Sequence, residues 1–177
     1  GYYAKRGEVH KIRPVHRLDR DTTGVIMFGK TREAEQYYTN QLQEGCIHRI
    51  YRGLVEGDIN SDGVVNAPIG VDPVFDNRRC IDDFGQEAIT EYRVIEHDDT
   101  KSLLEFKLLT GRTHQIRVHM AHIHHPIIGD AMYGTRNKPY TRQALHAYSL
   151  TFVPYGQTEA ITVVAPVPSD LGLEIHT

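Results

Sequence analysis

Short apolar runs alternate with polar segments rich in glycine and proline along most of the chain, and only two stretches have helical periodicity. The first covers residues 32–43, which Thr31 precedes as an N-cap and Gly45 follows as a stop signal. Its apolar positions are Ala34, Tyr37, Tyr38 and Leu42. The second covers residues 113–124, which begin at Thr113 and end before a proline. Its apolar positions are Ile116, Met120 and Ile123.

Strand patterns outnumber these helices. The predicted strands are residues 24–30, 47–56, 88–96, 102–110, 143–153 and 160–164. The first of them is a continuous apolar run typical of a buried strand, and residues 57–85 form an irregular acidic segment with a strand-like piece at 63–67. Because strands and helices do not alternate regularly, we predict an α+β fold with a mixed, largely antiparallel sheet and flanking helices. At 177 residues, one domain is expected, with residues 1–13 as an arm.

The net charge of −3 hides a strongly uneven distribution. Residues 1–53 carry +4, residues 54–100 carry −9 and residues 101–150 carry +5. If the fold brings the two basic blocks together, they form a cationic face that attracts a polyanion, because the local field matters more than the total charge. The alternative is that these charges solvate opposite surfaces, and composition leaves both interpretations open.

The two cysteines, Cys46 and Cys80, form neither a Cys-x-x-Cys pair nor a disulfide framework. We therefore expect reduced thiols in a reducing compartment. The chain has no apolar run of membrane-spanning length and no basic-then-apolar leader. These features predict a cytoplasmic protein without a membrane partner.

The loop over residues 15–24 is the first candidate for chemistry, because Asp19 and Asp21 lie there among arginines. Nearby positive charge keeps a carboxylate ionised, and a positioned carboxylate is a nucleophile, a general base or a metal ligand. The alternative is a turn in which these side chains cap backbone amides. Local sequence does not decide between the two aspartates.

Two further stretches are candidates for binding. Tyr51 in the strand 47–56 is either a packing residue or a platform on which a nucleobase stacks. In residues 110–119 a strand ends at a glycine turn and a helix begins, so that backbone amides, Arg112 and Arg117 gather at one place. That arrangement is typical of an anion site, and Arg117 is placed to pair with a buried carboxylate. The alternative is a solvated first turn capped by Thr113.

Five histidines cluster late in the chain: His114, His119, His122, His124 and His125. They lack the spacing of a zinc-binding helix, and no acidic residue lies among them. Contacts to RNA phosphates or structural hydrogen bonds explain them more simply than a metal does.

Four segments together resemble the RluA-type pseudouridine synthases, in the order and at the spacing of that family. They are His-Arg-Leu-Asp-Arg-Asp-Thr-Thr-Gly at 16–24, the tyrosine strand at 51–57, the run at 109–122 with Gly-Asp-Ala-Met-Tyr-Gly at 129–134, and the late strand at 142–147. The resemblance covers about residues 14–153. The chain has Thr22-Thr23 where the family more often has Thr-Ser. It also begins after the Lys-Pro-containing strands that usually come first, so we expect a fragment of a longer protein with an exposed sheet edge.

The resemblance implies a pseudouridine synthase, an isomerase that breaks the glycosidic bond of a uridine in ribosomal or transfer RNA and rejoins the base through C5. It implies Asp19 as nucleophile or base, Arg117 holding that carboxylate, and Tyr51 stacking on the flipped uracil. It assigns Leu145 to the apolar wall of the pocket and Arg17 to the space that the base vacates. The residues expected to hold phosphates are Arg112, His114, Arg136, Lys138 and Arg142. No cofactor or metal is implied, and a monomer is expected.

Two hypotheses from other classes remain at this stage. A non-catalytic RNA-binding module would present the same face and would tolerate loss of the Asp19 carboxylate. A metallohydrolase built on the histidines would bind zinc or manganese and would be inhibited by a chelator.

Overall fold

The computed structural model describes residue 11, residues 13–135 and residues 139–172, so the predicted arm falls almost wholly outside it. The helices are α1 (Arg32–Gln43), α2 (Gln115–His122) and the short 3-10 helix η2 (Ser169–Leu171). The longer strands are β4 (His48–Glu56), β8 (Ile89–His97), β9 (Lys101–Leu108) and β10 (Leu145–Phe152). The shorter strands are β1 (Arg13–Pro14), β2 (Thr23–Gly24), β3 (Phe28–Gly29), β5 (Gly63–Asn66), β6 (Ile69–Val71), β7 (Arg79–Ile81) and β11 (Ile161–Val164).

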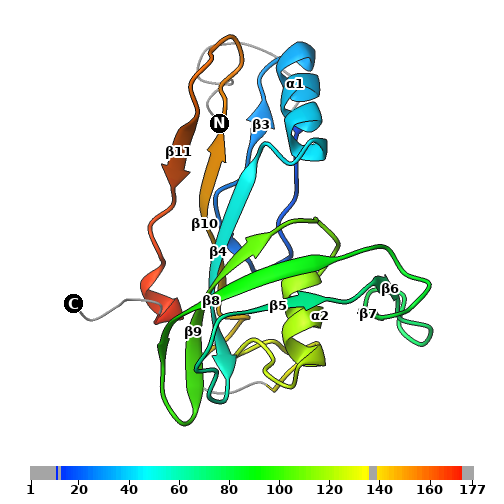
Figure 1. Cartoon of the computed structure of the whole chain (residues 1–177), viewed down its shortest axis with the longest axis vertical. Coiled ribbons are helices and arrows are strands. Elements are labelled where there is room, and N and C mark those ends of the chain that lie inside the picture. Colours follow the sequence, from blue (N-terminus) through cyan, green and yellow to red (C-terminus); the bar gives the residue numbers. More distant parts are fainter. Residues whose placement is uncertain (1–10, 12, 136–138, 173–177) are drawn as a thin grey trace.

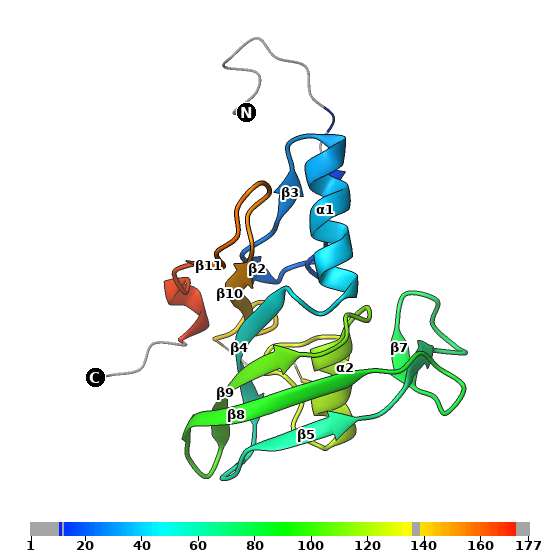
Figure 2. The same cartoon turned by 45° about the horizontal axis from the view of Figure 1, so that its top comes forward.

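A seven-stranded sheet runs through the described part of the chain in the order β11-β10-β4-β9-β8-β5. Neighbours in this path are antiparallel, while β2 adds to β10 as a parallel strand. The fold is therefore α+β with a mixed, mostly antiparallel sheet, as the sequence predicts. The sheet is strongly twisted: β10 and β4 run along the long axis of the molecule, and β8 and β5 cross it (Figures 1 and 2).

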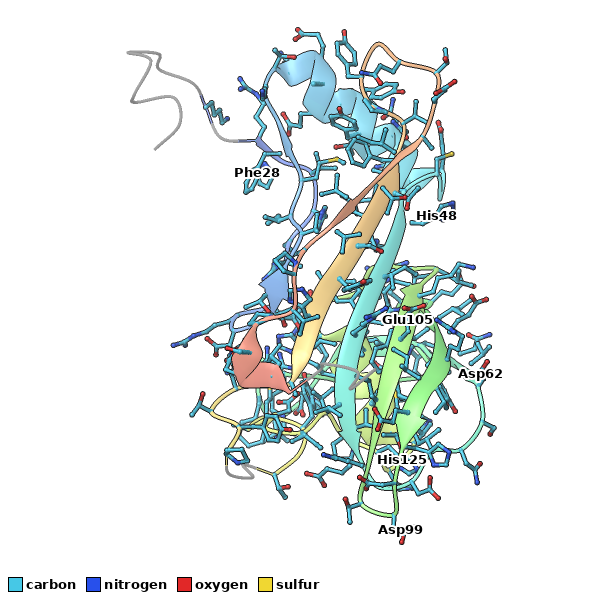
Figure 3. All side chains as sticks on the ribbon, turned by 90° about the vertical axis from the view of Figure 1, so that its left-hand side faces the viewer. Phe28, His48, Asp62, Asp99, Glu105 and His125 are labelled. Carbon is cyan, nitrogen blue, oxygen red and sulfur yellow. The ribbon has the colours of Figure 1, made fainter. Side chains whose placement is uncertain are left out.

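The two helices cover different parts of this sheet (Figure 1). One hydrophobic cluster joins α1 to the first loop and to the far ends of β4 and β10, and it contains Val15, Met27, Ile47, Leu150, Tyr38, Leu42 and Phe152. A second, larger cluster joins α2 to β4 and β9, with Tyr51, Val55, Leu104, Phe106, Ile116, Met120 and Leu145 among its members. Figure 3 shows His48, at the start of β4, on the α1 side, and Asp99, in the β8–β9 turn, at the opposite end.

Helix α1 has the predicted limits. The hydroxyl of Thr31 accepts a hydrogen bond from the amide of Ala34 at 3.2 Å, which satisfies one of the free amides of the first turn. After the last turn, Gly45 adopts a φ of 74°, a conformation that glycine reaches without steric cost.

Helix α2 is shorter than predicted, and Thr113 does not cap it. The N-cap is His114 with a φ of 60°, and it makes no side-chain capping bond. Instead Gln115, the first helical residue, accepts hydrogen bonds from the amide of Arg112 at 2.9 Å and from the hydroxyl of Thr110 at 2.8 Å. At the other end His124 has a φ of 67°, and its amide and the next one bond back to Ala121 and Met120 in a Schellman motif. The helix thus ends at His122, four positions before the proline.

Two other segments differ from the prediction. Residues 24–30 form no single buried strand: β2 and β3 are separate, and β3 pairs with β1 rather than with the main sheet. Burial there alternates, with Met27 buried and Phe28 45% exposed. Figure 3 shows Phe28 pointing away from the β4–β10 pair. The acidic segment contains the predicted piece as β5, and also the hairpin β6–β7, whose strands are too short for periodicity to reveal. No helix in the described ranges is long and apolar enough to cross a membrane.

Candidate active site

The loop before β2 presents Asp19 on a tight turn. The amide of Thr22 donates to the carbonyl of Asp19 at 3.1 Å, and Asp21 inside this turn has a φ of 69°. Aspartate is one of the few residues that adopt this left-handed conformation at modest cost. Asp21 therefore shapes the turn, while the Asp19 side chain, 15% exposed, lines a cavity. The two aspartates that the local sequence left equivalent have different roles.

The start of β10 and the residues before it hold this loop in place. The side-chain amide of Gln143 donates to the carbonyl of Arg20 at 2.6 Å and to the hydroxyl of Thr22 at 3.1 Å. Gly24 lies so close to β10 that a Cβ atom there would be 2.2 Å from the Ala147 carbonyl oxygen, and its φ is 119°. Only glycine satisfies both constraints. The late strand thus fixes the position of Asp19.

Arg142 has a structural role that differs from the expected phosphate contact. Its guanidinium makes a bidentate ion pair with Asp170, at 3.0 Å for both bonds, and donates to the carbonyl of Asp21 at 3.0 Å. Through these contacts the Arg142 side chain holds the loop against η2. Arg136 and Lys138, two other expected phosphate contacts, lie outside the described residues.

Arg117 links two carboxylates at the base of the site. Its Nη1 is 3.4 Å from Oδ2 of Asp19, and its Nε and Nη2 donate to the two oxygens of Asp130 at 2.7 and 2.9 Å. The Asp130 side chain is fully buried and also accepts from the amides of Met132 and Tyr133. Burial disfavours the charge of Arg117, but the interaction with Asp130, and then that with Asp19, outweighs this and raises the pKa of Arg117. Asp19 therefore faces a permanent, rigidly held cation.

Tyr51 lies beside Asp19 and is more buried than the sequence suggested. It occupies the middle of β4, opposite Ala147 on β10 and Phe106 on β9, and only 7% of its surface is exposed. Its burial is that of a packing residue, and the residue also lines the cavity, so neither of the two interpretations left open by the sequence is removed. Burial raises the pKa of Tyr51 and Asp19 adds to the effect, against the opposing charge of Arg49. The phenol is consequently protonated at neutral pH.

A cavity of about 580 Å³ opens above these groups where the two hydrophobic clusters meet. It brings together six of the site residues predicted from the sequence, because its lining includes Arg17, Asp19, Tyr51, Arg112, His114 and Leu145. Arg117 lies behind Asp19, and Arg142 is not part of the lining. Arg17 is exposed and Leu145 is buried. The lining draws on both basic blocks of the sequence, and Asp19 is the one acidic residue among its members.

Arg112 and His114 stand at the turn between β9 and α2. Arg112 is anchored by a bond from its Nε to the carbonyl of Glu87 at 2.8 Å. The ring of His114 meets the hydroxyl of Tyr133 at 2.8 Å, and that hydroxyl accepts from the amide of Arg79. The tyrosine hydrogen is therefore available to Nδ1, which leaves the histidine proton on Nε2. Burial lowers the pKa of His114 despite the opposing effect of Asp19, so its ring is neutral at pH 7.

The other histidines of the cluster serve different parts of the fold. His119 is fully buried between the Thr90 hydroxyl and the Ala67 carbonyl, at 2.9 and 3.0 Å. His125 contacts the carbonyl of Glu56 at 2.8 Å. Among the residues that the structure describes, no group of three or more histidine, cysteine or acidic side chains is arranged to hold a metal ion.

The buried histidines predict that the protein loses stability on mild acidification. Burial lowers the pKa of His119 and of His146 below the ordinary value of about 6.5, which the unfolded chain retains. Between the two values the unfolded state binds more protons, so the unfolding free energy is complete above about pH 7 and falls as the pH drops towards 5. The slope per histidine reaches at most about 1.4 kcal/mol per pH unit. Urea unfolding at a series of pH values measures it.

His119→Gln is expected to flatten this pH dependence, because glutamine supplies a donor and an acceptor that do not titrate. The matched control is His48→Gln, an exposed position at the start of β4, which should keep the slope of the native chain. Equal slopes for the two variants would contradict the assignment to His119.

Three residues of the site escaped the sequence analysis. Asp130 lies in a segment that carried the family resemblance, but nothing local marks it as the partner of a residue 13 positions earlier. Arg49 precedes Tyr51 by two positions in a predicted strand, so the alternation of the strand was enough to place both on one face. Gln143 braces the loop that carries Asp19 from more than 120 positions away, and no pattern in the sequence signals that contact.

Comparison with solved structures places the fold in a known class. The structure of human RNA pseudouridylate synthase domain containing 1 superposes with a TM-score of 0.80 at 29% identity, over 93% of this chain and 72% of that one. A family model described as RNA pseudouridylate synthase matches residues 2–122. The chain belongs to the RNA pseudouridylate synthase family.

Curated bacterial relatives agree with this membership. An uncharacterized RNA pseudouridine synthase, YhcT of Bacillus subtilis, is 42% identical over 96% of this chain and 57% of its own length. Ribosomal large subunit pseudouridine synthase D is 38% identical in Escherichia coli, over 96% of this chain and 56% of that protein. The chain thus spans about half the length of the curated relatives it matches.

Proposed function

We propose that this chain catalyses the isomerisation of uridine to pseudouridine in RNA, with Asp19 as the catalytic carboxylate. The observation that carries the proposal is the ion-pair array at the base of the cavity. A partly exposed carboxylate lies 3.4 Å from a cation that a second, fully buried carboxylate fixes in place. This arrangement suits a reacting group, because it stays ionised and oriented while one side remains accessible to substrate.

The reaction conserves every atom of the uridine. The bond between C1′ of the ribose and N1 of uracil breaks, the uracil turns, and a bond forms between C1′ and C5. The proton on C5 is lost and N1 gains one, so no oxidant, reductant or water is consumed. The carboxylate of Asp19 supplies the electron pair that the first step needs, either to the ribose or to the base. Arg117 disperses its charge and prevents it from rotating away.

The cavity accounts for how the base is held during this step. A target uridine must leave its stack, which costs a few kcal/mol. The ring of Tyr51 offers a stacking surface worth roughly 1–3 kcal/mol, and Leu145 closes the apolar side of the pocket. Arg17 is exposed at the rim, two residues from Asp19, and fills the gap that the base leaves. Arg112 and His114 bind the strand on the α2 side of the cavity.

Similarity to ribosomal large subunit pseudouridine synthases D favours large-subunit ribosomal RNA as the substrate, ahead of transfer RNA. The test is to incubate the chain with unmodified transcripts of both RNAs that carry tritium at C5 of uridine. Isomerisation replaces the C5 hydrogen and releases tritium to water, so release from the ribosomal transcript is the expected result. Binding of both transcripts without release from either would overturn the proposal and indicate an RNA-binding module instead.

A further inference from the structure

Arg49 is a half-buried cation on the wall of the cavity that has no acidic partner. It lies in β4, two residues before Tyr51 and on the same face of the strand. Its Nη2 donates to the carbonyl of Thr110 at 3.1 Å, and its Nε is buried without a hydrogen-bond partner. No carboxylate of the described residues lies within ion-pair distance of it. Burial lowers the pKa of Arg49, yet a guanidinium remains charged at neutral pH.

The backbone beside Arg49 leaves room for this unpaired group. A Cβ atom at Gly111 would lie 2.8 Å from Nη1 and 3.2 Å from Nη2 of Arg49, so a larger residue there would displace the guanidinium. The glycine turn between β9 and α2 thus forms a cradle that keeps the charge inside the cavity wall.

The neighbour of Arg49 does not neutralise it. His16 also lines the cavity, and its Nε2 accepts from the amide of Met27 at 3.2 Å, which places the ring proton on Nδ1. That Nδ1 has no hydrogen-bond partner. Burial, and then the charge of Arg49, lower the pKa of His16 against a smaller opposing effect of the Arg17 backbone, so the ring is neutral at pH 7. A desolvated cation beside a neutral ring is costly unless an anion from outside compensates it.

We propose that Arg49 binds a backbone phosphate of the RNA directly beside the target nucleotide. Alternate residues of a strand are about 7 Å apart, so the guanidinium is displaced from the stacking ring of Tyr51 by roughly the distance from a base to its own backbone phosphate. The planar fork of arginine matches two phosphate oxygens, and the unpaired donors of Arg49 are available for them. This inference rests on the proposed function for the identity of the anion.

The test is the salt dependence of RNA binding, which does not require turnover. Fluorescence anisotropy with an oligouridine of about 12 nucleotides gives the affinity between about 50 and 200 mM salt. Arg49→Gln is expected to weaken binding about ten-fold at the low salt and to reduce the slope of log affinity against log salt by about 0.7, the value for one lost contact to a single strand. Arg49→Lys should retain the slope. Arg93→Gln removes the same charge from an exposed position on β8 and should bind like the native chain.

Thermal unfolding separates this binding role from a structural one. Because Arg49 has few partners in the free protein, Arg49→Gln is expected to melt at or above the temperature of the native chain, whereas a structural arginine would lower it. If Arg49→Gln does not fold, Gly111→Ala displaces the guanidinium from its position and should weaken binding with the slope reduced by the loss of one contact. A native slope for a folded Arg49→Gln, or an equal loss for Arg93→Gln, would overturn the proposal.

Failure of this inference is distinguishable from failure of the proposed function. A chain that releases no tritium but loses one salt-dependent contact in Arg49→Gln would keep the phosphate site and lose the isomerase assignment. A chain that releases tritium with the same KM in Arg49→Gln would keep the isomerase assignment and lose the phosphate site.

Discussion

Asp19→Asn is expected to lower the rate of tritium release from RNA by at least about a thousand-fold, because the amide can neither attack nor accept a proton as the carboxylate does. RNA affinity should stay within about two-fold, since the carboxylate contributes repulsion rather than attraction towards a polyanion. The fold should also survive, because Arg117 keeps its bidentate bonds to Asp130. Single-turnover tritium release and anisotropy binding measure the two quantities separately.

The matched control for this experiment lies two residues away. Asp21→Asn makes the same chemical change in the same loop, and asparagine tolerates the left-handed backbone that Asp21 adopts. It should release tritium at nearly the native rate. Similar rates for Asp19→Asn and the native chain would remove Asp19 from the mechanism, and similar losses in both variants would indicate damage to the loop rather than loss of a catalytic group. An RNA that carries 5-fluorouridine adds a further readout, because the native chain should process or trap it and Asp19→Asn should not.

The sequence predicted this centre because its residues lie within segments that have strong local signatures. Asp19 and Arg117 are 98 positions apart, and only the family resemblance joined them before the structure did. Local signals also located α1, where the cap, the apolar face and the terminating glycine all agree. In each of these places several independent features of the sequence indicate the same structure.

The predictions were wrong where a side-chain contact that the local pattern does not show determined the structure. Thr113 is a good N-cap by type, but the left-handed His114 takes the cap position, and the Gln115 side chain accepts from the amide of Arg112 before the helix. Arg142 was expected to hold a phosphate, whereas its guanidinium makes a bidentate ion pair with Asp170. Local propensity does not predict such contacts, because they depend on which residues the folded chain brings together.

The same limit explains why Asp130 was missed, although it is the main partner of Arg117. The sequence indicated that Arg117 holds Asp19, and it does lie 3.4 Å away, but the shorter bonds go to Asp130. Because the Asp130 carboxylate is completely buried, its bidentate pair with Arg117 contributes to the stability of the fold as well as to the electrostatics of the site. The contribution of this pair to stability depends on the burial of Asp130, and that burial is known only from the fold.

Asp130→Asn is accordingly expected to destabilise the protein by about 3–5 kcal/mol, because it leaves the Arg117 cation buried with Asp19 as its remaining partner. Activity should fall as well, since Arg117 is then free to shift towards Asp19 or away from it. Urea unfolding measures the stability, and tritium release under conditions where the variant remains folded measures the rate.

The chain contains a matched comparison in the second bidentate arginine–aspartate pair. Arg142 and Asp170 form two bonds of 3.0 Å, but the Asp170 side chain is 55% exposed whereas that of Asp130 is fully buried. Water replaces much of what an exposed pair loses, so Asp170→Asn should cost no more than about 1 kcal/mol and leave the rate of isomerisation nearly native. Equal destabilisation by the two substitutions would show that burial does not set the strength of the Arg117–Asp130 pair. A large difference in stability together with a loss of rate confined to Asp130→Asn would show that this buried aspartate holds Arg117 in position behind Asp19.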